Sequence, residues 1–275
     1  MKLLQRFFDF YLDASVHVAL GVISLYKVTI ALLQFSTNWF LLGFLFFGTI
    51  VCYNFIKYGV EAKKYVIVTN PYHKAIQVFS FLSFLLAIYF FFYLDFKVWI
   101  TVMVLGLLST LYAIPFLPKA KNLRSLGGMK IFLVALVWVG CTVVLPVVDN
   151  KLFVTWNTGL QMIQRFLLIL VLLLPFEIRD LVYDNVVLKT IPQRIGIKKT
   201  KLLGYLFILV YVFLELFKEI HSKPDLCAKL LLCLVLIIVL YKTKEKQSKY
   251  YASFYVESIS IGYYFLLNLF LMLLS

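Results

Sequence analysis

The sequence predicts an all-α, polytopic membrane protein with about nine transmembrane helices. Three observations predict it. The 275 residues are 63% hydrophobic and 15% charged, whereas soluble proteins average roughly 45–50% apolar and about 25% charged residues. The apolar residues form nine runs, each close to the ~20 residues that a helix needs to cross a bilayer. The basic residues between these runs are concentrated on one side of the predicted membrane.

Charged or turn-forming residues separate the nine predicted spans, which lie near residues 14–34, 38–58, 75–94, 98–117, 130–148, 155–178, 202–217, 226–241 and 252–274. Trp39, Trp99 and Trp156 all fall at the non-cytoplasmic ends of their spans, where an aromatic belt is expected. No Gly/Ser-rich linker divides the chain. We therefore expect a single domain over residues 1–275.

The distribution of Lys and Arg predicts the orientation. Nine spans place the N-terminus and the loops after the second, fourth, sixth and eighth spans on one side, and these regions carry 20 of the 27 basic residues, against 5 on the other side. By the positive-inside rule the richer side is cytoplasmic. The net charge of +14 is then directed at lipid head groups, which argues against a nucleic-acid partner. We expect an integral protein of a bacterial inner (plasma) membrane.

The cysteines and the N-terminus predict no disulfide, no zinc site and no signal-peptide cleavage. The four cysteines lie in or beside apolar runs without Cys-x-x-Cys spacing, so no disulfide or zinc site is expected; they are Cys52, Cys141, Cys227 and Cys233. Asp9 and Asp13 interrupt the basic start, and no small-residue cleavage site follows. A cleaved signal peptide is therefore not expected.

The loop after the sixth span is the richest in chemistry. Glu177, Asp180 and Asp184 are spaced i, i+3, i+7, which places them on one face of a helix that continues out of the span. Three stacked carboxylates require a cation nearby. Two alternatives satisfy them: a divalent ion such as Mg²⁺, which prefers carboxylate oxygens, or basic residues of the same loop, namely Arg179, Lys189 or Arg194.

The segment EIRDLVYDNVVLKTIPQRIG resembles the second aspartate motif of the UbiA superfamily of intramembrane prenyltransferases. Asp180 and Asp184 occupy the acidic positions of D-x-x-x-D, residues 190–192 form the Thr-Leu-Pro-like turn, and Gly196 is the following glycine. The nine spans, the cytoplasmic N-terminus and the segment LYAIPFLPKAKNLRSLGGMKIFLVALVW are also similar to that family. The resemblance covers essentially the whole chain.

The resemblance implies a helical bundle around a central cavity and an activity. In the family, Mg²⁺ bound by two acidic motifs holds the diphosphate of an isoprenyl donor, and the isoprenyl group passes to a lipophilic acceptor of aromatic or quinone type. Asp180 and Asp184 are then the expected catalytic residues and Mg²⁺ ligands. The metal and basic side chains stabilise the departing diphosphate, and an apolar cavity shields the allylic cation from water.

The first motif of the family, roughly N-D-x-x-D-x-x-x-D, is incomplete. It is expected near residue 54, where the chain reads CYNFIKYGVEAKK. Asn54 holds the leading position, but the acidic positions carry Phe55, Tyr58 and Ala62, and Glu61 is one residue out of register. Two hypotheses follow. In the first, Lys57, with Lys63 as a second candidate, replaces a Mg²⁺ ion at the diphosphate. In the second, the chain is a catalytically degenerate relative that binds a lipid, a quinone-like ligand or a partner.

Several other residues are candidates for the site. We expect donor contacts from residues near the cytoplasmic face: Asn54, Lys57, Arg124, Lys130 and Lys189. The alternative for Arg124 and Lys130 is a purely topological role. Glu257 and His17 lie at similar depths, and we expect them on the acceptor side. Because the charged residues cluster at one face and form no path across the membrane, a transporter is less favoured.

Ionisable residues also occur in the other half of the membrane. Lys27 and Glu215 both lie in the outer half of their spans, and we expect them to pair with each other. Arg165 lies near the midplane, and the sequence assigns it no partner.

Overall fold

The computed structural model describes residues 2–59, 70–113, 128–182 and 189–274. Within these ranges the regular structure is entirely helical, which confirms the all-α prediction. The elements in chain order are α1 (Lys2–Asp13), α2 (Val16–Leu33), α3 (Trp39–Asn54), η1 (Phe55–Gly59), α5 (Pro71–Phe91), α6 (Phe96–Ala113), α7 (Lys130–Val139), η3 (Gly140–Val144), α8 (Leu145–Asp149), α9 (Trp156–Asp180), α10 (Ile191–Phe213), η5 (Leu214–Phe217), α11 (Lys223–Lys242), η6 (Tyr251–Val256) and α12 (Ser258–Leu274). Segments η1, η3 and η6 are π-helical, and η5 is a 3₁₀ turn.

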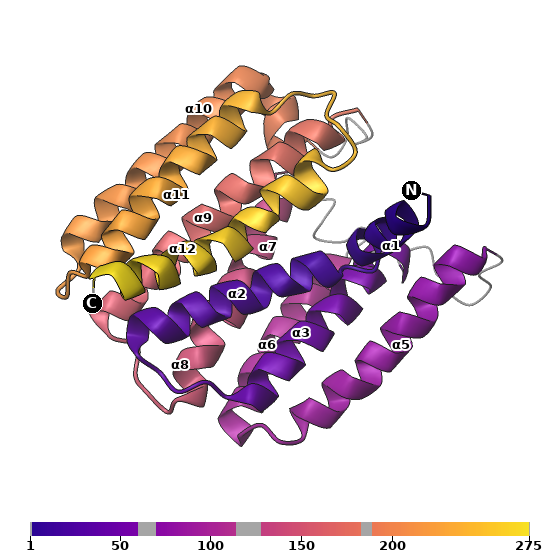
Figure 1. The fold of residues 1–275 in the computed structure, drawn as a ribbon, viewed down its shortest axis with the longest axis horizontal. Coiled ribbons are helices and arrows are strands. Elements are labelled where there is room, and N and C mark those ends of the chain that lie inside the picture. Colours follow the sequence, from indigo (N-terminus) through magenta and orange to yellow (C-terminus); the bar gives the residue numbers. More distant parts are fainter. Residues whose placement is uncertain (1, 60–69, 114–127, 183–188, 275) are drawn as a thin grey trace.

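The predicted spans agree with the observed helices. In the described part of the chain, eight helical segments are long and apolar enough to cross a membrane, and a shorter apolar helix, Phe96–Tyr112, corresponds to the fourth predicted span. These helices run side by side, with α5 at one edge of the bundle and α10 and α11 at the other (Figure 1). Large apolar side chains are exposed along their outer faces, where water is an unfavourable solvent. The protein is therefore an integral membrane protein.

Polar residues at the helix starts define where several spans begin. The Asn38 side chain accepts hydrogen bonds from the backbone N–H groups of Phe40 and Leu41, at 2.9 and 3.3 Å. Asn70 caps α5 in the same way, and Pro71 follows as the first helical residue. These caps satisfy N–H groups that lack a partner within the helix.

The seventh span begins earlier than predicted. The sequence places it at residue 202, after a run of lysines, whereas α10 begins at Ile191. The Thr190 N–H donates to Gln193 Oε1 at 2.9 Å, and Pro192 lies in the first turn, so the local sequence starts a helix there. Gly196 interrupts it with φ +79°, a backbone conformation that glycine adopts readily.

Helix α9 is the centre of the fold. Its residues 167–172 are all buried, together with Leu174, and they pack in one core with side chains of α2, α7, α10, α11 and α12. The helix also carries the buried polar side chains Gln161, Gln164 and Arg165, which favour protein neighbours over lipid. The last turn of this buried helix carries Glu177 and Asp180. We refer to the end of the bundle where α9 finishes as the Asp180 end.

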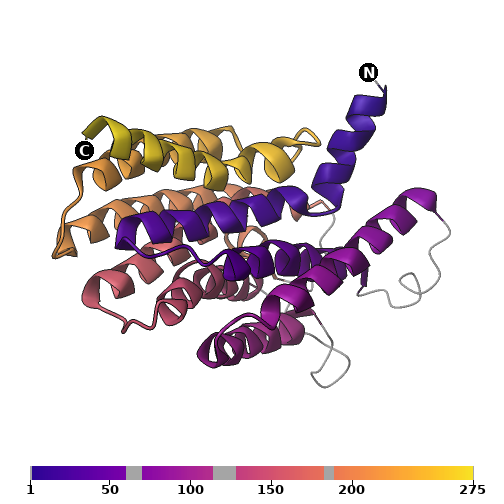
Figure 2. The ribbon, with the colours of Figure 1, turned by 60° about the horizontal axis from the view of Figure 1, so that its bottom comes forward.

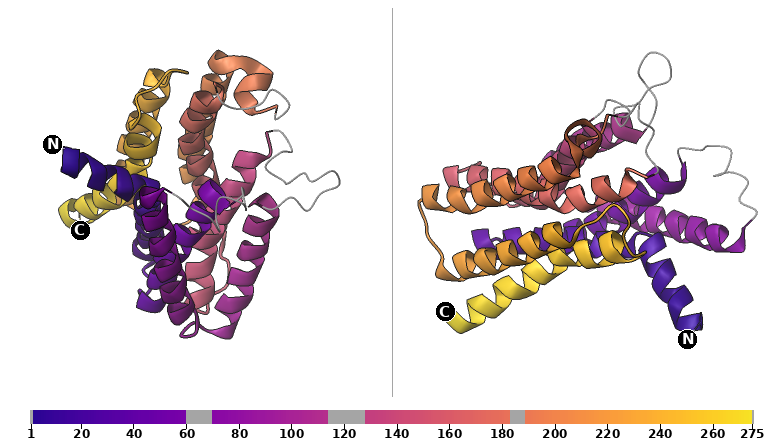
Figure 3. Two further views of the ribbon diagram at one scale, coloured as in Figure 1. Left: turned by 90° about the vertical axis from the view of Figure 1, so that its right-hand side faces the viewer. Right: turned by 90° about the horizontal axis from the view of Figure 1, so that it is seen from above.

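The two termini lie at opposite ends of the bundle, the N-terminus near the Asp180 end (Figures 1 and 2). Helix α1 projects from that end at a steep angle to the other helices, as two further views show (Figure 3). An odd number of spans places the termini at opposite ends, in agreement with the predicted threading.

The expected pair between Lys27 and Glu215 is wrong. Lys27 Nζ donates to Thr37 Oγ1 at 3.1 Å and lies 4.6 Å from the centre of the Trp39 ring. Glu215 instead belongs to a buried ionic cluster at the end opposite Asp180, which consists of Glu215, Lys218, Asp225 and Lys229. In sequence, Lys218 and Lys229 are two of the five basic residues on the predicted non-cytoplasmic side, and a count by side gives no information on ion pairs.

Arg165 is buried at membrane depth and bonds to α2. Its Nη1 donates to the Leu25 carbonyl oxygen at 2.8 Å, and Nη2 to Thr29 Oγ1 at 3.4 Å. Backbone and hydroxyl oxygens therefore take its hydrogen bonds.

Candidate functional site

A cavity of about 320 Å³ opens inside the bundle at the Asp180 end. Its volume lies within the usual range of ligand sites, ≈ 300–1,000 Å³. We call it the polar cavity because six charged side chains, from η1, α7, α9 and the junction of η6 with α12, line it: Lys57, Lys130, Glu177, Arg179, Asp180 and Glu257. Five of these residues are predicted site residues or members of the predicted acidic face, and the structure brings them together.

The two described carboxylates of α9 both meet a basic side chain. Lys130, the first residue of α7, places its Nζ 2.8 Å from Oε1 of Glu177, whose side chain is 2% exposed. Arg179 holds Asp180 through Nε and Nη2, both 2.8 Å from Oδ1. Arg179 is one of the loop bases that the sequence offers as a partner, whereas Lys130 of α7 is not among them. Asp184 and Arg124 lie outside the described residues.

Lys57 enters the polar cavity from the π-helical turn η1, where its Nζ donates to the Leu12 carbonyl oxygen at 3.3 Å. Glu257 directly follows the π-helical segment η6. π-helical segments occur frequently at functional sites because the wider turn changes the direction of side chains. Among the described lining residues, the two charges without an ion-pair partner thus lie in or directly after a π-helical turn.

Asn54 lies outside the polar cavity. Its amide donates to the Ala14 carbonyl oxygen at 3.2 Å and to Ser80 Oγ at 2.8 Å, and it accepts from Ser15 Oγ at 2.8 Å. The side chain is 1% exposed. In this arrangement Asn54 connects the turn between α1 and α2 to α3 and α5, instead of pointing towards a ligand.

His17 and Lys189 also lie outside the lining of the polar cavity. His17 bonds through Nδ1 to the Tyr11 hydroxyl, and through Nε2 to the Phe254 carbonyl oxygen and Ser258 Oγ, both at 3.1 Å. It therefore connects α1, α2 and the last span. Lys189 is exposed and has a left-handed backbone, with φ +46°.

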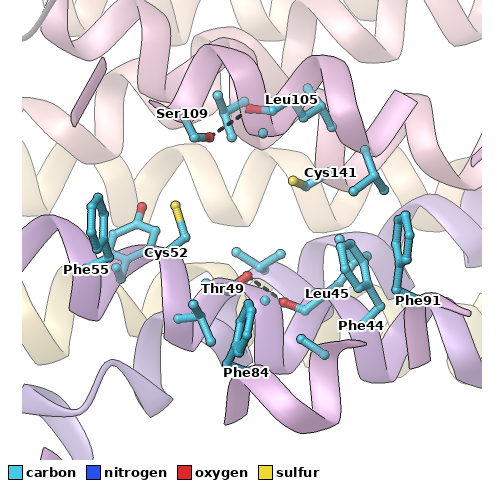
Figure 4. Close-up of a pocket in the computed structure, with 18 of the residues that line it drawn as sticks. Phe44, Leu45, Thr49, Cys52, Phe55, Phe84, Phe91, Leu105, Ser109 and Cys141 are labelled. Atoms are coloured by element: carbon cyan, nitrogen blue, oxygen red, sulfur yellow. Dashed lines mark hydrogen bonds between the residues drawn. The ribbon is translucent and has the colours of Figure 1, made fainter. Parts of the chain in front are cut away.

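A second cavity of about 500 Å³ adjoins the polar one. Side chains of α3, α5, α6 and η3 surround it (Figure 4), among them Phe44, Phe84, Leu105 and Cys141. The Thr49 and Ser109 hydroxyls, which also face it, donate to carbonyl oxygens of their own helices. We call this space the apolar cavity.

Both cavities share a hydrogen-bonded aromatic pair. The Trp138 indole N–H donates to the Tyr53 hydroxyl oxygen at 2.8 Å, and both side chains line both spaces. The sequence interpretation missed these residues, because a chain with 18 Tyr and 27 Phe has aromatic side chains near any site. Ser253 and Ser260, on either side of Glu257 in the chain, also line the polar cavity.

The described residues supply few carboxylates for a divalent cation. At the first motif, Phe55 and Tyr58 supply no carboxylate, and Asn54 is used elsewhere. Within the described ranges, no group of three Asp, Glu, His or Cys side chains is placed to hold a metal. Asp180, at the mouth of the cavity, is the described carboxylate that matches the family motif.

Solved structures provide the comparison that decides the fold. A UbiA homologue from Archaeoglobus fulgidus bound to DMAPP and Mg²⁺ superposes with a TM-score of 0.66, over 96% of this chain and 99% of that chain, at 12% sequence identity. The chain has the UbiA fold. A UbiA homologue from the same organism bound to GPP and Mg²⁺ gives a TM-score of 0.63 at 11% identity, over the same shares of the two chains.

A third structure with the UbiA fold is described as a digeranylgeranylglyceryl phosphate synthase. It superposes with a TM-score of 0.56 at 15% identity, over 99% of this chain and 97% of that chain. By sequence, no protein-family model and no curated protein matches the chain. The UbiA fold is thus present in a chain whose sequence has diverged widely from these structures.

Proposed function

We propose that this protein is a membrane prenyltransferase that transfers an isoprenyl group from a prenyl diphosphate to a lipophilic acceptor of aromatic or quinone type. The observation that carries the proposal is the junction of the two cavities, which puts charged side chains and an apolar chamber of about 500 Å³ into direct continuity. A prenyl diphosphate has the same two parts. The likeness to UbiA homologues bound to DMAPP or GPP with Mg²⁺ supports it.

The diphosphate would occupy the polar cavity. Lys57 meets no carboxylate within the described ranges, so its ammonium is available to a phosphate oxygen. Asp180, together with Asp184, would hold one Mg²⁺, which would stabilise negative charge on the departing diphosphate. Arg179 and Lys130 lie beside these groups and add positive charge at the same end.

The isoprenyl chain would occupy the apolar cavity. Its walls supply aromatic and aliphatic side chains, which exclude water from an allylic cation. The aromatic faces attract positive charge. We propose that the Asp180 end faces the cytoplasm of a bacterium, because the basic residues concentrate there.

Donor binding tests the proposal directly. The purified chain in lipid nanodiscs would be titrated with a non-hydrolysable prenyl thiolodiphosphate, with and without Mg²⁺. We expect Mg²⁺-dependent binding that Asp180→Asn weakens by about tenfold or more. Asp95→Asn is the matched control, since Asp95 is exposed and pairs with Lys151 at 3.0 Å, far from the cavity. Equal binding by wild type and Asp180→Asn would contradict the assignment.

A second candidate function is a catalytically degenerate UbiA-like protein that binds a lipid or quinone-like ligand or a partner. The observation that favours it is the loss of acidic residues at Phe55 and Tyr58, combined with the ion pairs that engage Glu177 and Asp180. Gentle extraction and mass spectrometry of co-purified lipids distinguish the two. A bound prenyl diphosphate supports the transferase, whereas a neutral lipid or quinone without diphosphate binding supports the alternative.

A further inference from the structure

Glu257 is the carboxylate of the polar cavity that has no partner in the described part of the chain. Glu177 meets Lys130 and Asp180 meets Arg179, but no hydrogen bond or ion pair from the described residues reaches the Glu257 side chain. Burial of an unpaired charge is costly. A carboxylate that remains unpaired beside a cavity is therefore available to a ligand that donates a hydrogen bond.

The surroundings of Glu257 define what it can contact. Ser253, four residues before it, and Ser260, three residues after it, line the same cavity. This wall therefore presents two hydroxyl groups and a carboxylate. Lys57 and Arg179 are the cations that act on Glu257 electrostatically. They belong to η1 and α9, so the carboxylate lies on a different wall from the groups assigned to the diphosphate.

The charges that remain unpaired in the polar cavity indicate which functional groups the acceptor can carry. Once the two ion pairs are formed, Lys57 and Glu257 carry the unpaired charges among the described lining residues. In the proposed function Lys57 contacts the diphosphate, which leaves Glu257 facing the acceptor. A carboxylate accepts a hydrogen bond from a hydroxyl group but repels a second anion.

We propose that Glu257 recognises the acceptor and that this acceptor is a neutral lipophile bearing a hydroxyl group, such as a phenol. This inference rests on the proposed function. During transfer, the bond between the allylic carbon and the diphosphate oxygen breaks, and its electron pair leaves with the diphosphate. The hydroxyl oxygen of the acceptor forms the new bond to the allylic carbon, and its proton passes to the Glu257 carboxylate. An acceptor with its own carboxylate is disfavoured in the same place.

Acceptor binding tests the inference without a donor. Isothermal titration of the full chain in nanodiscs would compare a medium-chain 4-alkylphenol with the matching 4-alkylbenzoate. We expect the wild type to prefer the phenol, and Glu257→Gln to reduce that preference by about tenfold. Glu257→Asp keeps the charge and should keep the preference. Glu245→Gln is the matched control, because Glu245 is exposed.

Two outcomes overturn the inference: a wild type that binds the benzoate as tightly as the phenol, and a Glu257→Gln variant with the wild-type preference. Thermal denaturation of each variant shows whether it is folded, and Glu257→Asp gives a reading if Glu257→Gln does not fold. A failure of donor binding in the wild type, with a Glu257-dependent preference for the phenol, removes the prenyltransferase proposal and keeps the acceptor site. Donor binding without a Glu257-dependent preference for the phenol keeps the prenyltransferase proposal and removes the acceptor site at Glu257.

Discussion

Lys57 and Tyr53 show how closely the polar cavity and the apolar cavity approach each other in this protein. The residues are four positions apart in the chain, yet Lys57 extends an ammonium into the polar cavity while Tyr53 lines both cavities. The Lys57 ammonium meets the Leu12 carbonyl oxygen at 3.3 Å, a long contact for a charged donor, and the side chain as a whole is exposed. Its strongest interaction is therefore expected with a ligand anion.

Replacement of Lys57 tests this expectation. Lys57→Gln should weaken the binding of a prenyl thiolodiphosphate by about tenfold, because a charge-assisted hydrogen bond is lost. Lys57→Arg should retain most of the affinity, since arginine also binds phosphate. The measurement is isothermal titration in nanodiscs, and Lys74→Gln at an exposed position is the control. Unchanged affinity in Lys57→Gln would exclude a contact with the diphosphate.

The Trp138–Tyr53 pair predicts a limit on the length of the isoprenyl chain. Trp138→Ala removes the larger ring at the junction of the cavities and should favour longer donors, since each additional buried methylene group contributes up to about 0.8 kcal/mol. Competition binding with isoprenyl diphosphates of increasing length measures the change. Tyr53→Phe removes the 2.8 Å hydrogen bond but keeps the ring, so it should shift the preference less. A variant series with the wild-type length profile would contradict this role.

At the scale of elements, three helices widen into π turns beside the cavities. Lys57 lies in η1, Cys141 lies in η3, and Glu257 follows η6. A π turn contains one more residue than an α turn, so the side chains after it point in a different direction. Counting at 3.6 residues per turn therefore fails beyond Asn54. The register argument against Glu61 depended on that count, and Glu61 itself lies outside the described residues.

The connection between η5 and α11 is held by the buried ionic cluster of Glu215, Lys218, Asp225 and Lys229. Lys229 Nζ lies 2.6 Å from Glu215 Oε2 and 2.8 Å from Asp225 Oδ2, and Lys218 bridges the same two acids. Lys229→Ala leaves two buried carboxylates with Lys218 as the one remaining cation of the cluster and should lower the free energy of unfolding by about 3–5 kcal/mol. Thermal denaturation in detergent measures it. Lys97→Ala, at an exposed position, should change little, and equal effects of the two substitutions would contradict the prediction.

At the scale of the whole molecule, α1 is attached to the last span by polar contacts. Lys249 Nζ lies 2.6 Å from Asp9 Oδ1, and the Tyr250 hydroxyl donates to the same oxygen at 2.9 Å. The hydrogen bond from Lys249 holds the pKa of Asp9 below its ordinary value of 3.8. The contact therefore stabilises the attachment above that value, and its contribution is lost as the pH falls through the lowered pKa.

Acidification should loosen α1 before it affects the membrane-spanning helices. Because both side chains are partly exposed, the effect is small. Hydrogen exchange of the α1 amides should increase between neutral pH and about pH 3, after correction for the intrinsic rate. Asp9→Asn should show the faster exchange already at neutral pH. Identical protection of α1 in wild type and Asp9→Asn would exclude a role for this contact.

The helices and their order could be predicted from the sequence, because lipid requires long apolar runs whatever the packing. The site was predicted in part. Lys57, Lys130, Asp180 and Glu257 do line one cavity, since ionisable groups at membrane depth usually face a cavity or a partner. This rule does not distinguish a residue that faces a cavity from one that bonds to a protein partner. His17 was therefore expected on the acceptor side, although it bonds to protein groups. Lys218 and Lys229 were missed for a related reason, because the count of basic residues on each side of the membrane says nothing of the acids that they meet.

At Trp138 and Tyr53, the polar cavity and the apolar cavity meet inside the protein. An amphiphilic molecule that enters is oriented by partition alone, with its head among the charges and its tail among Phe44, Phe84 and Leu105. Orientation therefore requires no particular polar contact. Individual polar contacts then need to provide only selectivity between ligands, because the orientation of each ligand is already set.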